Sequence, residues 1–245
     1  MERADEIIRN VAAVRARIAA AARRAGRESG EITLVAVTKT HPESLVRLAQ
    51  AAGITDCGEN RVQEAEAKIP ALRDLPLRWH LIGHLQRNKA RRAIALFDMI
   101  HAVDSARLAT HLDRIIAESA PARRLPVLLQ VNVSGELSKE GFDLPGGLDN
   151  RESLPAFYES VAQIVALPRL DVQGLMTIAP YTVDPEGARP TFRTLRRLRD
   201  DLARRFPESS WRHLSMGMTG DFEVAIEEGA TIVRVGRAIF GEREG

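Results

Sequence analysis

The sequence predicts an α/β protein, a single (β/α)8 TIM barrel with one extra helix in front. Short, β-branched apolar runs alternate with amphipathic helical segments along the whole chain. Eight such runs read as strands, and nearly every one is followed by a helix. Strict alternation implies parallel strands joined by right-handed crossovers, and eight units in roughly 250 residues are typical of this barrel. No linker divides the chain, so we assign residues 1–245 to one domain. A doubly wound open sheet is the alternative.

Each element follows from its own pattern. The segment 2–27 is predicted as a helix because apolar residues recur in it at spacings of three and four. These are Ile7, Val11, Val14 and Ile18. The run at 32–37 is nearly all apolar, as in a strand buried on both faces of a parallel sheet. The later strands are predicted at 54–58, 78–83, 99–103, 126–133, 170–177, 212–216 and 231–235. The helices between them are predicted at 42–52, 60–72, 87–97, 105–119, 151–166, 187–206 and 219–228, with a long loop at 134–150.

Composition excludes several classes of protein. Hydrophobic residues make up 44% of the chain and charged residues 28%, which is ordinary for a globular protein and argues against disorder. No apolar run approaches the roughly 18 residues of a membrane helix, and no signal-peptide core follows Met1. The one cysteine, Cys57, cannot form an internal disulfide, which fits the cytoplasm. The net charge is only +2, and the arginine-rich stretch 193–205 is expected to be a solvated helix face, so nucleic acid is not an expected partner.

Lysine is rare in this chain. The four lysines among the 35 basic residues are Lys39, Lys68, Lys89 and Lys139. Lys39 follows the first strand, at the end that a barrel places in its active-site mouth. Beside apolar strand residues an amine loses hydration, its pKa falls, and it can attack a carbonyl carbon. A lysine that only points into solvent is the alternative. Lys68 and Lys89 fall on charged helical segments, whereas Lys139 lies in the loop after the fifth strand and could approach the mouth.

Turns rich in small residues follow the last two predicted strands. The stretch 214–221 leaves the seventh strand and the stretch 232–241 leaves the eighth. In a barrel these two positions are a common phosphate site. Glycines allow backbone N–H groups to approach an anion, the hydroxyls of Ser215 and Thr219 add donors, and Arg237 adds charge. Ordinary turn chemistry, with Thr219 as a helix N-cap, is the alternative.

Other polar residues stand in unusual positions. Arg234 interrupts an apolar strand, and burying its charge requires a partner, either a carboxylate or a ligand acceptor. Asn60 follows the second strand, where it could cap the next helix, with Gln63 completing a capping box, or face the mouth. His80 and His84 lie four residues apart on one face of a strand, but the sequence offers no third ligand, so we do not predict a metal site.

Six motifs of the chain together resemble the pyridoxal phosphate homeostasis protein family, also called YggS-like or proline synthase co-transcribed protein. They are Val37–Lys39, Gly58–Glu64, Trp79–Lys89, Gly174–Ile178, Ser215–Asp221 and Val233–Gly241. They match in order from about residue 5 to 242, and the combination is highly specific. The chain departs from the family's usual residues at Cys57, Arg61, Leu81 and Arg87.

The resemblance implies a fold like the N-terminal domain of alanine racemase, with pyridoxal 5′-phosphate held as a Schiff base on Lys39. It implies that Asn60 lies near the cofactor ring and that Arg234 faces the pyridine nitrogen. The phosphate contacts that it implies are Ser215, Gly217, Gly236 and Arg237. The implied role is vitamin B6 and amino- and keto-acid homeostasis in the cytoplasm. Pyridoxal-phosphate-dependent apoenzymes are the expected partners, no membrane is involved, and we expect a monomer or weak dimer.

The chemistry of these residues argues for little or no turnover. The cofactor is a strong electron sink when its ring nitrogen is protonated, whereas a guanidinium can only donate and does not favour that proton. The related racemases take a second acid/base group from an additional β-domain, and only five residues follow Phe240. We therefore expect a non-catalytic carrier. A small racemase or lyase is the alternative, as is a regulatory protein that binds a partner in response to the cofactor.

Overall fold

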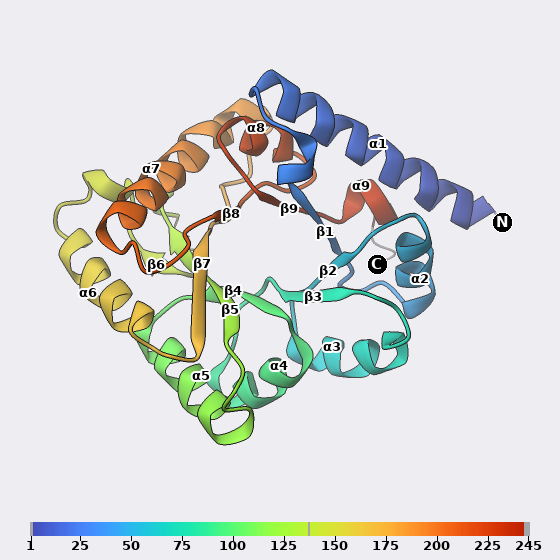
Figure 1. The fold of residues 1–245 in the computed structure, drawn as a ribbon. Helices are drawn as coiled ribbons and strands as arrows, with labels where there is room; N and C mark the ends of the chain where they lie inside the picture. The colour runs from blue at the N-terminus through green and yellow to red at the C-terminus, as the bar shows by residue number, and fades with distance from the viewer. Residues whose placement is uncertain (1, 137, 243–245) are drawn as a thin grey trace.

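Parallel strands close into a barrel at the centre of the molecule (Figure 1). The computed structural model describes residues 2–136 and 138–242. Within this part of the chain eight strands pair in the circular order β1, β2, β3, β4, β5, β7, β8, β9, and β9 pairs again with β1. They are β1 (Thr33–Val37), β2 (Asp56–Glu59), β3 (Arg78–Leu81), β4 (Met99–Val103), β5 (Leu125–Asn132), β7 (Leu170–Met176), β8 (His213–Ser215) and β9 (Ile232–Val235). The predicted barrel is confirmed, and the open sheet is wrong.

Helices surround the barrel, and one of them precedes the first strand. They are α1 (Glu2–Arg24), α2 (Glu43–Ala51), α3 (Val62–Lys68), α4 (Ala90–Leu96), α5 (Ala106–Ser119), α6 (Leu154–Val165), α7 (Arg189–Arg205), α8 (Phe222–Glu227) and α9 (Arg237–Phe240). The apolar face predicted for the first helix is buried, and α1 packs with it against α8, α9 and α2. The side chains of Arg3 and Asn10 donate to the carbonyl oxygens of Phe240 and Ile239, which ties α1 to the last helix.

Several helices are shorter than predicted because single 3₁₀ turns take their ends. The turns that do so are η2 (Ile69–Leu72), η3 (Arg87–Lys89) and η5 (Pro185–Ala188). Two further turns, η1 (Ser29–Glu31) and η4 (Gly147–Asp149), lie outside the predicted helices. The helix predicted over 60–72 divides at Ile69, because Pro70 has no N–H to donate to the preceding turn. The segment predicted as a loop at 134–150 contains η4 and a short strand, β6 (Phe142–Asp143), which pairs with β5. The four-residue helix α9 is too short to show a periodicity in sequence.

The inside of the barrel is partly apolar and partly polar. Alternate residues of a strand face the same side, and β4 departs from this alternation where its pairing with β5 shifts register between Ile100 and Val103. Val35, Met99, Ala102, Leu128, Met176 and Ile232 form a small interior cluster. The large apolar core, which includes the buried face of α1, lies between the strands and the surrounding helices. Buried polar side chains share the interior, notably His80, His101, Ser215 and Arg234. No helix within the described residues has both the length and the apolar character needed to cross a bilayer.

Candidate functional site

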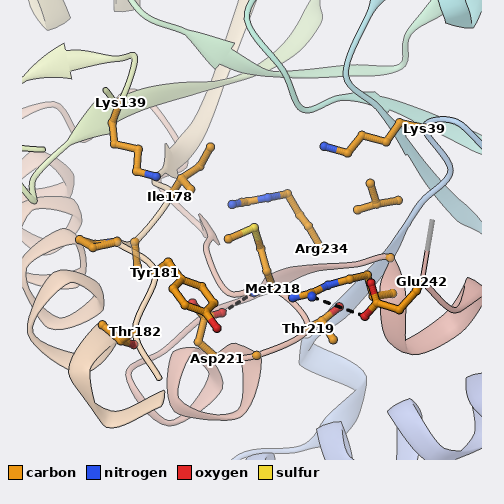
Figure 2. A pocket seen from close by; sticks show the side chains of 16 residues that line it. Lys39, Lys139, Ile178, Tyr181, Thr182, Met218, Thr219, Asp221, Arg234 and Glu242 are labelled. Atoms are coloured by element: carbon orange, nitrogen blue, oxygen red, sulfur yellow. Dashed lines mark hydrogen bonds and ion pairs between the residues drawn. The ribbon is translucent and has the colours of Figure 1, made fainter. Parts of the chain in front are cut away.

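A cavity of about 500 Å3 opens where the strands end (Figure 2). Its walls come from the segments that follow β1, β7, β8 and β9, with Lys139 added from the loop after β5. The lining residues are Val37, Lys39, Lys139, Ile178, Ala179, Pro180, Tyr181, Thr182, Met218, Thr219, Gly220, Asp221, Arg234, Gly236, Arg237 and Glu242. This is the mouth in which the barrel fold was expected to place functional residues, and its volume suits a small-molecule ligand.

Lys39 reaches the cavity directly from the end of β1, as predicted from its place after the first strand. Its side chain extends into the cavity in Figure 2. The residue before it, Thr38, makes two hydrogen bonds to the neighbouring strand. Its N–H donates to Gly58 O at 3.0 Å, and its hydroxyl donates to Glu59 Oε1 at 2.7 Å. The backbone that carries Lys39 is therefore fixed by the neighbouring strand β2.

Lys68 is buried, although its charged helical surroundings in the sequence gave no sign of this. Its Nζ donates to Glu59 Oε1 at 2.6 Å and to Thr38 O at 2.7 Å. Burial raises the pKa of Glu59, and the Lys68 and Thr38 contacts offset only part of that shift. The Lys68 amine is thus engaged in a buried ion pair, and the pair supports the strand end that carries Lys39.

The remaining two lysines differ in their access to the cavity. Lys139 lines it, and its Nζ lies 3.7 Å from Glu136 Oε2. Figure 2 shows Lys39 and Lys139 reaching in from opposite sides, with the guanidinium of Arg234 between them in this view. Lys89 lies in the turn η3 and is not among the lining residues. The mouth therefore brings together Lys39 and Lys139.

Arg234 is an almost fully buried cation at the cavity, with only 4% of its surface exposed. Its Nη1 donates to Ser215 Oγ at 2.6 Å and its Nη2 to Thr177 O at 2.9 Å. The sequence left two possible partners for Arg234, a carboxylate or a ligand acceptor. Among the described residues its side-chain hydrogen bonds go to a hydroxyl and a carbonyl oxygen, and not to a carboxylate. Burial lowers the pKa of Arg234 to about 10, and the nearby Asp221 opposes the shift. Arg234 therefore remains charged at neutral pH and can only donate.

The turns after β8 and β9 contribute some of the predicted phosphate contacts to the cavity and not others. Gly236 and Arg237 line it, and so does Thr219. Ser215 and Gly217 are not among the lining residues. The hydroxyl of Ser215 is buried beneath the cavity, between Arg234 and His101. Phosphate contacts from Ser215 and Gly217 stay predictions.

Gly217 has a packing role that its sequence position did not reveal. Its φ of +95° favours glycine, and a Cβ there would lie 2.6 Å from Ala225 Cβ on α8.

Asp221 is a lining residue to which the sequence assigned no role. Its Oδ1 accepts from Met218 N at 2.6 Å, which closes the turn that carries Thr219. Burial raises the pKa of Asp221, while the Met218 amide and the charge of Arg234 lower it.

Asn60 is not among the lining residues of this cavity, and its predicted place near a cofactor ring stays a prediction. The capping role considered for it is wrong. The N-cap of α3 is Arg61, which makes no side-chain capping bond, so no capping box with Gln63 forms. The Asn60 backbone packs instead against the next strand end, where a Cβ added to Gly83 would lie 2.5 Å from Asn60 O.

The two histidines considered as a metal pair have separate partners. His80 Nε2 lies 2.9 Å from Asp56 Oδ1 inside the barrel. His84 Nδ1 lies 3.2 Å from Asp104 Oδ2 on a more exposed part of the chain. Within residues 2–136 and 138–242, no group of three or more His, Cys, Asp or Glu side chains could hold a metal ion. Cys57 is buried, and burial raises the pKa of its thiol to about 12, which makes it unreactive.

Comparison with known proteins gives consistent relationships. The family model "Alanine racemase, N-terminal domain" matches residues 10–244. A Pseudomonas aeruginosa protein named "Pyridoxal phosphate homeostasis protein" is 45% identical over 240 residues, which cover 97% of this chain and 96% of that protein. An Escherichia coli K12 protein of the same name is 43% identical over 244 residues, 98% of each chain.

Solved structures agree with these sequence relatives. PipY of Synechococcus elongatus PCC7942, solved with PLP bound, has a TM-score of 0.81 and 38% identity, covering 96% of this chain and 100% of that chain. Alanine racemase of Clostridium difficile 630 has a TM-score of 0.70 at 13% identity, covering 100% of this chain and 61% of that chain, and so shares the fold. By the barrel, the family model and these near full-length relatives, the chain belongs to the pyridoxal phosphate homeostasis protein family.

Proposed function

We propose that this protein binds pyridoxal 5′-phosphate in the cavity at the barrel mouth, as a Schiff base on Lys39. The observation that carries the proposal is the set of groups around one space: the Lys39 amine, the buried Arg234 cation, and the turns at Thr219 and Gly236. This donor set fits the cofactor. An aldehyde needs an amine, a phosphate needs hydroxyl and N–H donors with positive charge, and a ring nitrogen accepts a hydrogen bond.

Each group has a separate task in this proposal. The ion pair of Lys68 with Glu59 fixes Thr38 and thereby the position of Lys39. Thr219, in the turn that follows Ser215 and β8, supplies a hydroxyl donor to the phosphate, because Thr219 lines the cavity. The first N–H groups of α9 have no acceptor within the helix and add backbone donors, and Arg237 adds charge.

The proposed role is to hold and supply the cofactor with little or no turnover. When bound, pyridoxal phosphate supplies an electron sink whose strength depends on protonation of its ring nitrogen. Arg234 donates to that nitrogen and so leaves it without a proton of its own. The relatives' name agrees with a role in pyridoxal phosphate homeostasis. We extend this role to vitamin B6 and to amino and keto acids. We place this function in the cytoplasm, with dependent apoenzymes as recipients and a single-domain monomer or weak dimer as the carrier.

The direct test is spectroscopic. Protein loaded with pyridoxal phosphate should show the visible absorption band of a lysine Schiff base, and borohydride should fix the label to the peptide that contains Lys39. Lys39→Ala should lose the band, whereas Lys89→Ala should keep it because Lys89 lies away from the cavity lining. A label on Lys68 or Lys139 would contradict the assignment.

A racemase or lyase remains the second candidate, and one observation favours it. Lys139 reaches the cavity from the side opposite Lys39 in Figure 2, where a second acid/base group would be needed. In deuterated water, the loaded protein would then exchange the α-hydrogen of amino acids. Exchange abolished by both Lys39→Ala and Lys139→Ala would establish catalysis and overturn the carrier role. No exchange above that of free cofactor supports the carrier.

A further inference from the structure

A line of hydrogen-bonded polar side chains crosses the barrel interior beneath Arg234. It links Asp56 of β2, His80 of β3, His101 of β4, Ser215 of β8 and Arg234 of β9, and we call it the polar chain. The donor–acceptor distances are 2.9 Å from Asp56 to His80, 2.9 Å from His80 to His101, 3.0 Å from His101 to Ser215 and 2.6 Å from Ser215 to Arg234. Each member is at most 5% exposed. Five separate strands thus direct one polar side chain each to a common path.

The proton positions at the two ends of the polar chain are fixed by chemistry. Burial raises the pKa of Asp56, but hydrogen bonds from His80, Thr55 and Arg78 outweigh it and bring the value to about 2. Asp56 is therefore a carboxylate that only accepts, and His80 Nε2 must carry a proton. At the other end Arg234 can only donate, so Ser215 Oγ accepts its proton.

Burial lowers the pKa of His101, so its ring is neutral, and two proton arrangements then remain between these ends. In the first, His80 carries one proton, His101 Nε2 donates to His80 Nδ1, and the Ser215 hydroxyl donates to His101 Nδ1. In the second, His80 carries two protons and both of these bonds are reversed. The second arrangement leaves the buried Ser215 hydroxyl proton without an acceptor among residues 2–136 and 138–242, because its contacts there are His101 and Arg234. An unsatisfied buried donor is costly.

Charge favours the first arrangement as well. The carboxylate of Asp56 is already paired with Arg78, whose Nε lies 2.9 Å from Oδ1 and whose Nη2 lies 2.9 Å from Oδ2. A second proton on His80 would add a cation between this pair and Arg234. His80 is itself only 5% exposed, and His101, which contacts it, has no exposed surface, so little solvent is available to stabilise that cation.

We propose that the polar chain is a one-way hydrogen-bond relay, with every proton donated toward Asp56, and that it positions Arg234. The Ser215 hydroxyl donates its hydrogen to His101 Nδ1, so Ser215 Oγ can only accept a hydrogen bond from Arg234 Nη1. Nη2 donates to Thr177 O, so the two hydrogen bonds on the barrel side fix the orientation of the guanidinium plane. Its remaining N–H groups then face the cavity. Asp56, His80, His101 and Ser215 are thus positioning residues that do not line this cavity. The effect on a bound cofactor rests on the proposed function, whereas the proton order does not.

The first experiment reads the proton order without any cofactor-dependent activity. Two-bond nitrogen–proton correlation spectra of ¹⁵N-histidine-labelled protein show which ring nitrogen carries hydrogen, and single histidine variants assign the signals. His80 and His101 are expected to be protonated at Nε2 only. A His101 protonated at Nδ1, or a His80 protonated at both nitrogens, would overturn the relay.

The second experiment uses a matched pair of variants at His101. His101→Asn places an amide oxygen where Nδ1 was and keeps an acceptor for Ser215, whereas His101→Gln places its amide near Nε2 and leaves the Ser215 hydroxyl unpaired. Both introduce an amide at the same buried position. With His101→Gln the dissociation constant for pyridoxal phosphate should rise roughly tenfold and the visible band should shift, while His101→Asn stays within about threefold of wild type. Equal effects would overturn the positioning role.

The two experiments separate failure of this inference from failure of the proposed function. If wild-type protein binds no pyridoxal phosphate, the proposed function is wrong, and the histidine spectra alone decide the relay. If both His101 variants fail to fold, Ser215→Ala takes their place, because it removes the acceptor of Arg234 and leaves the histidine pair intact. Cofactor affinity and absorption unchanged in folded Ser215→Ala would count against the positioning role.

Discussion

At the scale of single residues, close backbone contacts decide which positions tolerate change. Gly174 on β7 has a φ of +151°, and a Cβ there would lie 1.9 Å from His213 O. The two residues are partners in the β7–β8 register, so neither backbone can move without separating the strands. The glycine in the Gly174–Ile178 motif is thus a requirement of barrel closure.

Gly174→Ala is therefore expected to destabilise the protein by more than about 3 kcal/mol or to prevent folding, because it combines a backbone clash with an unfavourable φ. Gly30→Ala is the control, since a Cβ at Gly30 would meet nothing within 4 Å. Urea unfolding of the two variants measures the difference. A Gly174→Ala protein as stable as wild type would show that β7 and β8 are not paired in this register.

Matched variants can also distinguish the hydroxyl of Ser215, at the end of β8, from that of Thr219, in the turn after it. Thr219 lines the cavity and Ser215 does not. Thr219→Val removes one donor at nearly constant volume, so the dissociation constant for pyridoxal phosphate should rise roughly tenfold. Thr219→Ser retains the hydroxyl and should bind nearly as wild type. Equilibrium titration measures both, and unchanged binding by Thr219→Val would remove Thr219 from the proposed phosphate contacts.

At the scale of elements, the N-terminal helix supports the turn beneath the cavity. α1 packs on α8 and α9, and it holds the α9 carbonyls of Ile239 and Phe240 through Asn10 and Arg3. α9 begins directly after Gly236, a lining residue. The helix that lies outside the β–α alternation is therefore a part of the support of the site.

Neighbouring isoleucines of α1 provide a matched test of this packing. Ile7 has no exposed surface, whereas Ile8 is 50% exposed. Ile7→Ala should lower the free energy of unfolding by about 2–5 kcal/mol, because it leaves a cavity between α1 and the barrel helices. Ile8→Ala should change it by less than about 0.5 kcal/mol. Thermal or urea unfolding measures both, and equal losses would contradict the packing of α1.

The arginines of the stretch 193–205 on helix α7 are exposed, as expected, except that Arg199 is half-buried, and several of them are ion-paired. Arg193 Nη2 lies 2.9 Å from Glu228 Oε1, and Arg197 Nη1 lies 3.2 Å from Asp149 Oδ2. Arg189, just before the stretch expected to be solvated, contacts carboxylates of Glu186, Glu227 and Glu228. These pairs join α7 to α8 and to η4. The exposed pair of Arg197 with Asp149 adds little stability, whereas the Glu228 carboxylate that binds Arg189 and Arg193 is buried.

At the scale of the whole molecule, the closed barrel has a buried carboxylate at the start of β2. Asp56 is 2% exposed and binds side chains of His80 and Arg78 on the adjacent strand. Its pKa of about 2 lies below that of an aspartate in an unfolded chain. On acidification the Asp56 carboxylate therefore binds its proton at a higher pH in the unfolded chain than in the folded protein. The stability that Asp56 contributes is complete above about pH 4 and is lost as the pH falls toward 2.

Asp56→Asn should accordingly reduce the loss of stability between pH 6 and pH 2.5 by roughly 2 kcal/mol relative to wild type. Asp143→Asn, at an exposed position on β6, is the control and should leave that loss unchanged. Urea unfolding at the two pH values gives the comparison. An identical acid loss in wild type and Asp56→Asn would show that this carboxylate is not held in its charged form.

The order of strands and helices, the closed barrel, and the strand end at which Lys39 lies could all be predicted from the sequence. These features follow from local periodicity and from the number of β–α units. Which polar side chains meet depends on how distant segments pack in three dimensions. His101 and Ser215 are 114 residues apart, and Lys68 reaches Thr38 across 30 residues. Ser215 and Thr219 look equivalent in sequence, but Ser215 ends β8 and turns into the barrel, whereas Thr219 lies in the turn beside the cavity. The physical reason is that burial and hydrogen-bond partners depend on the face each strand presents after closure, which register and distant strands set together.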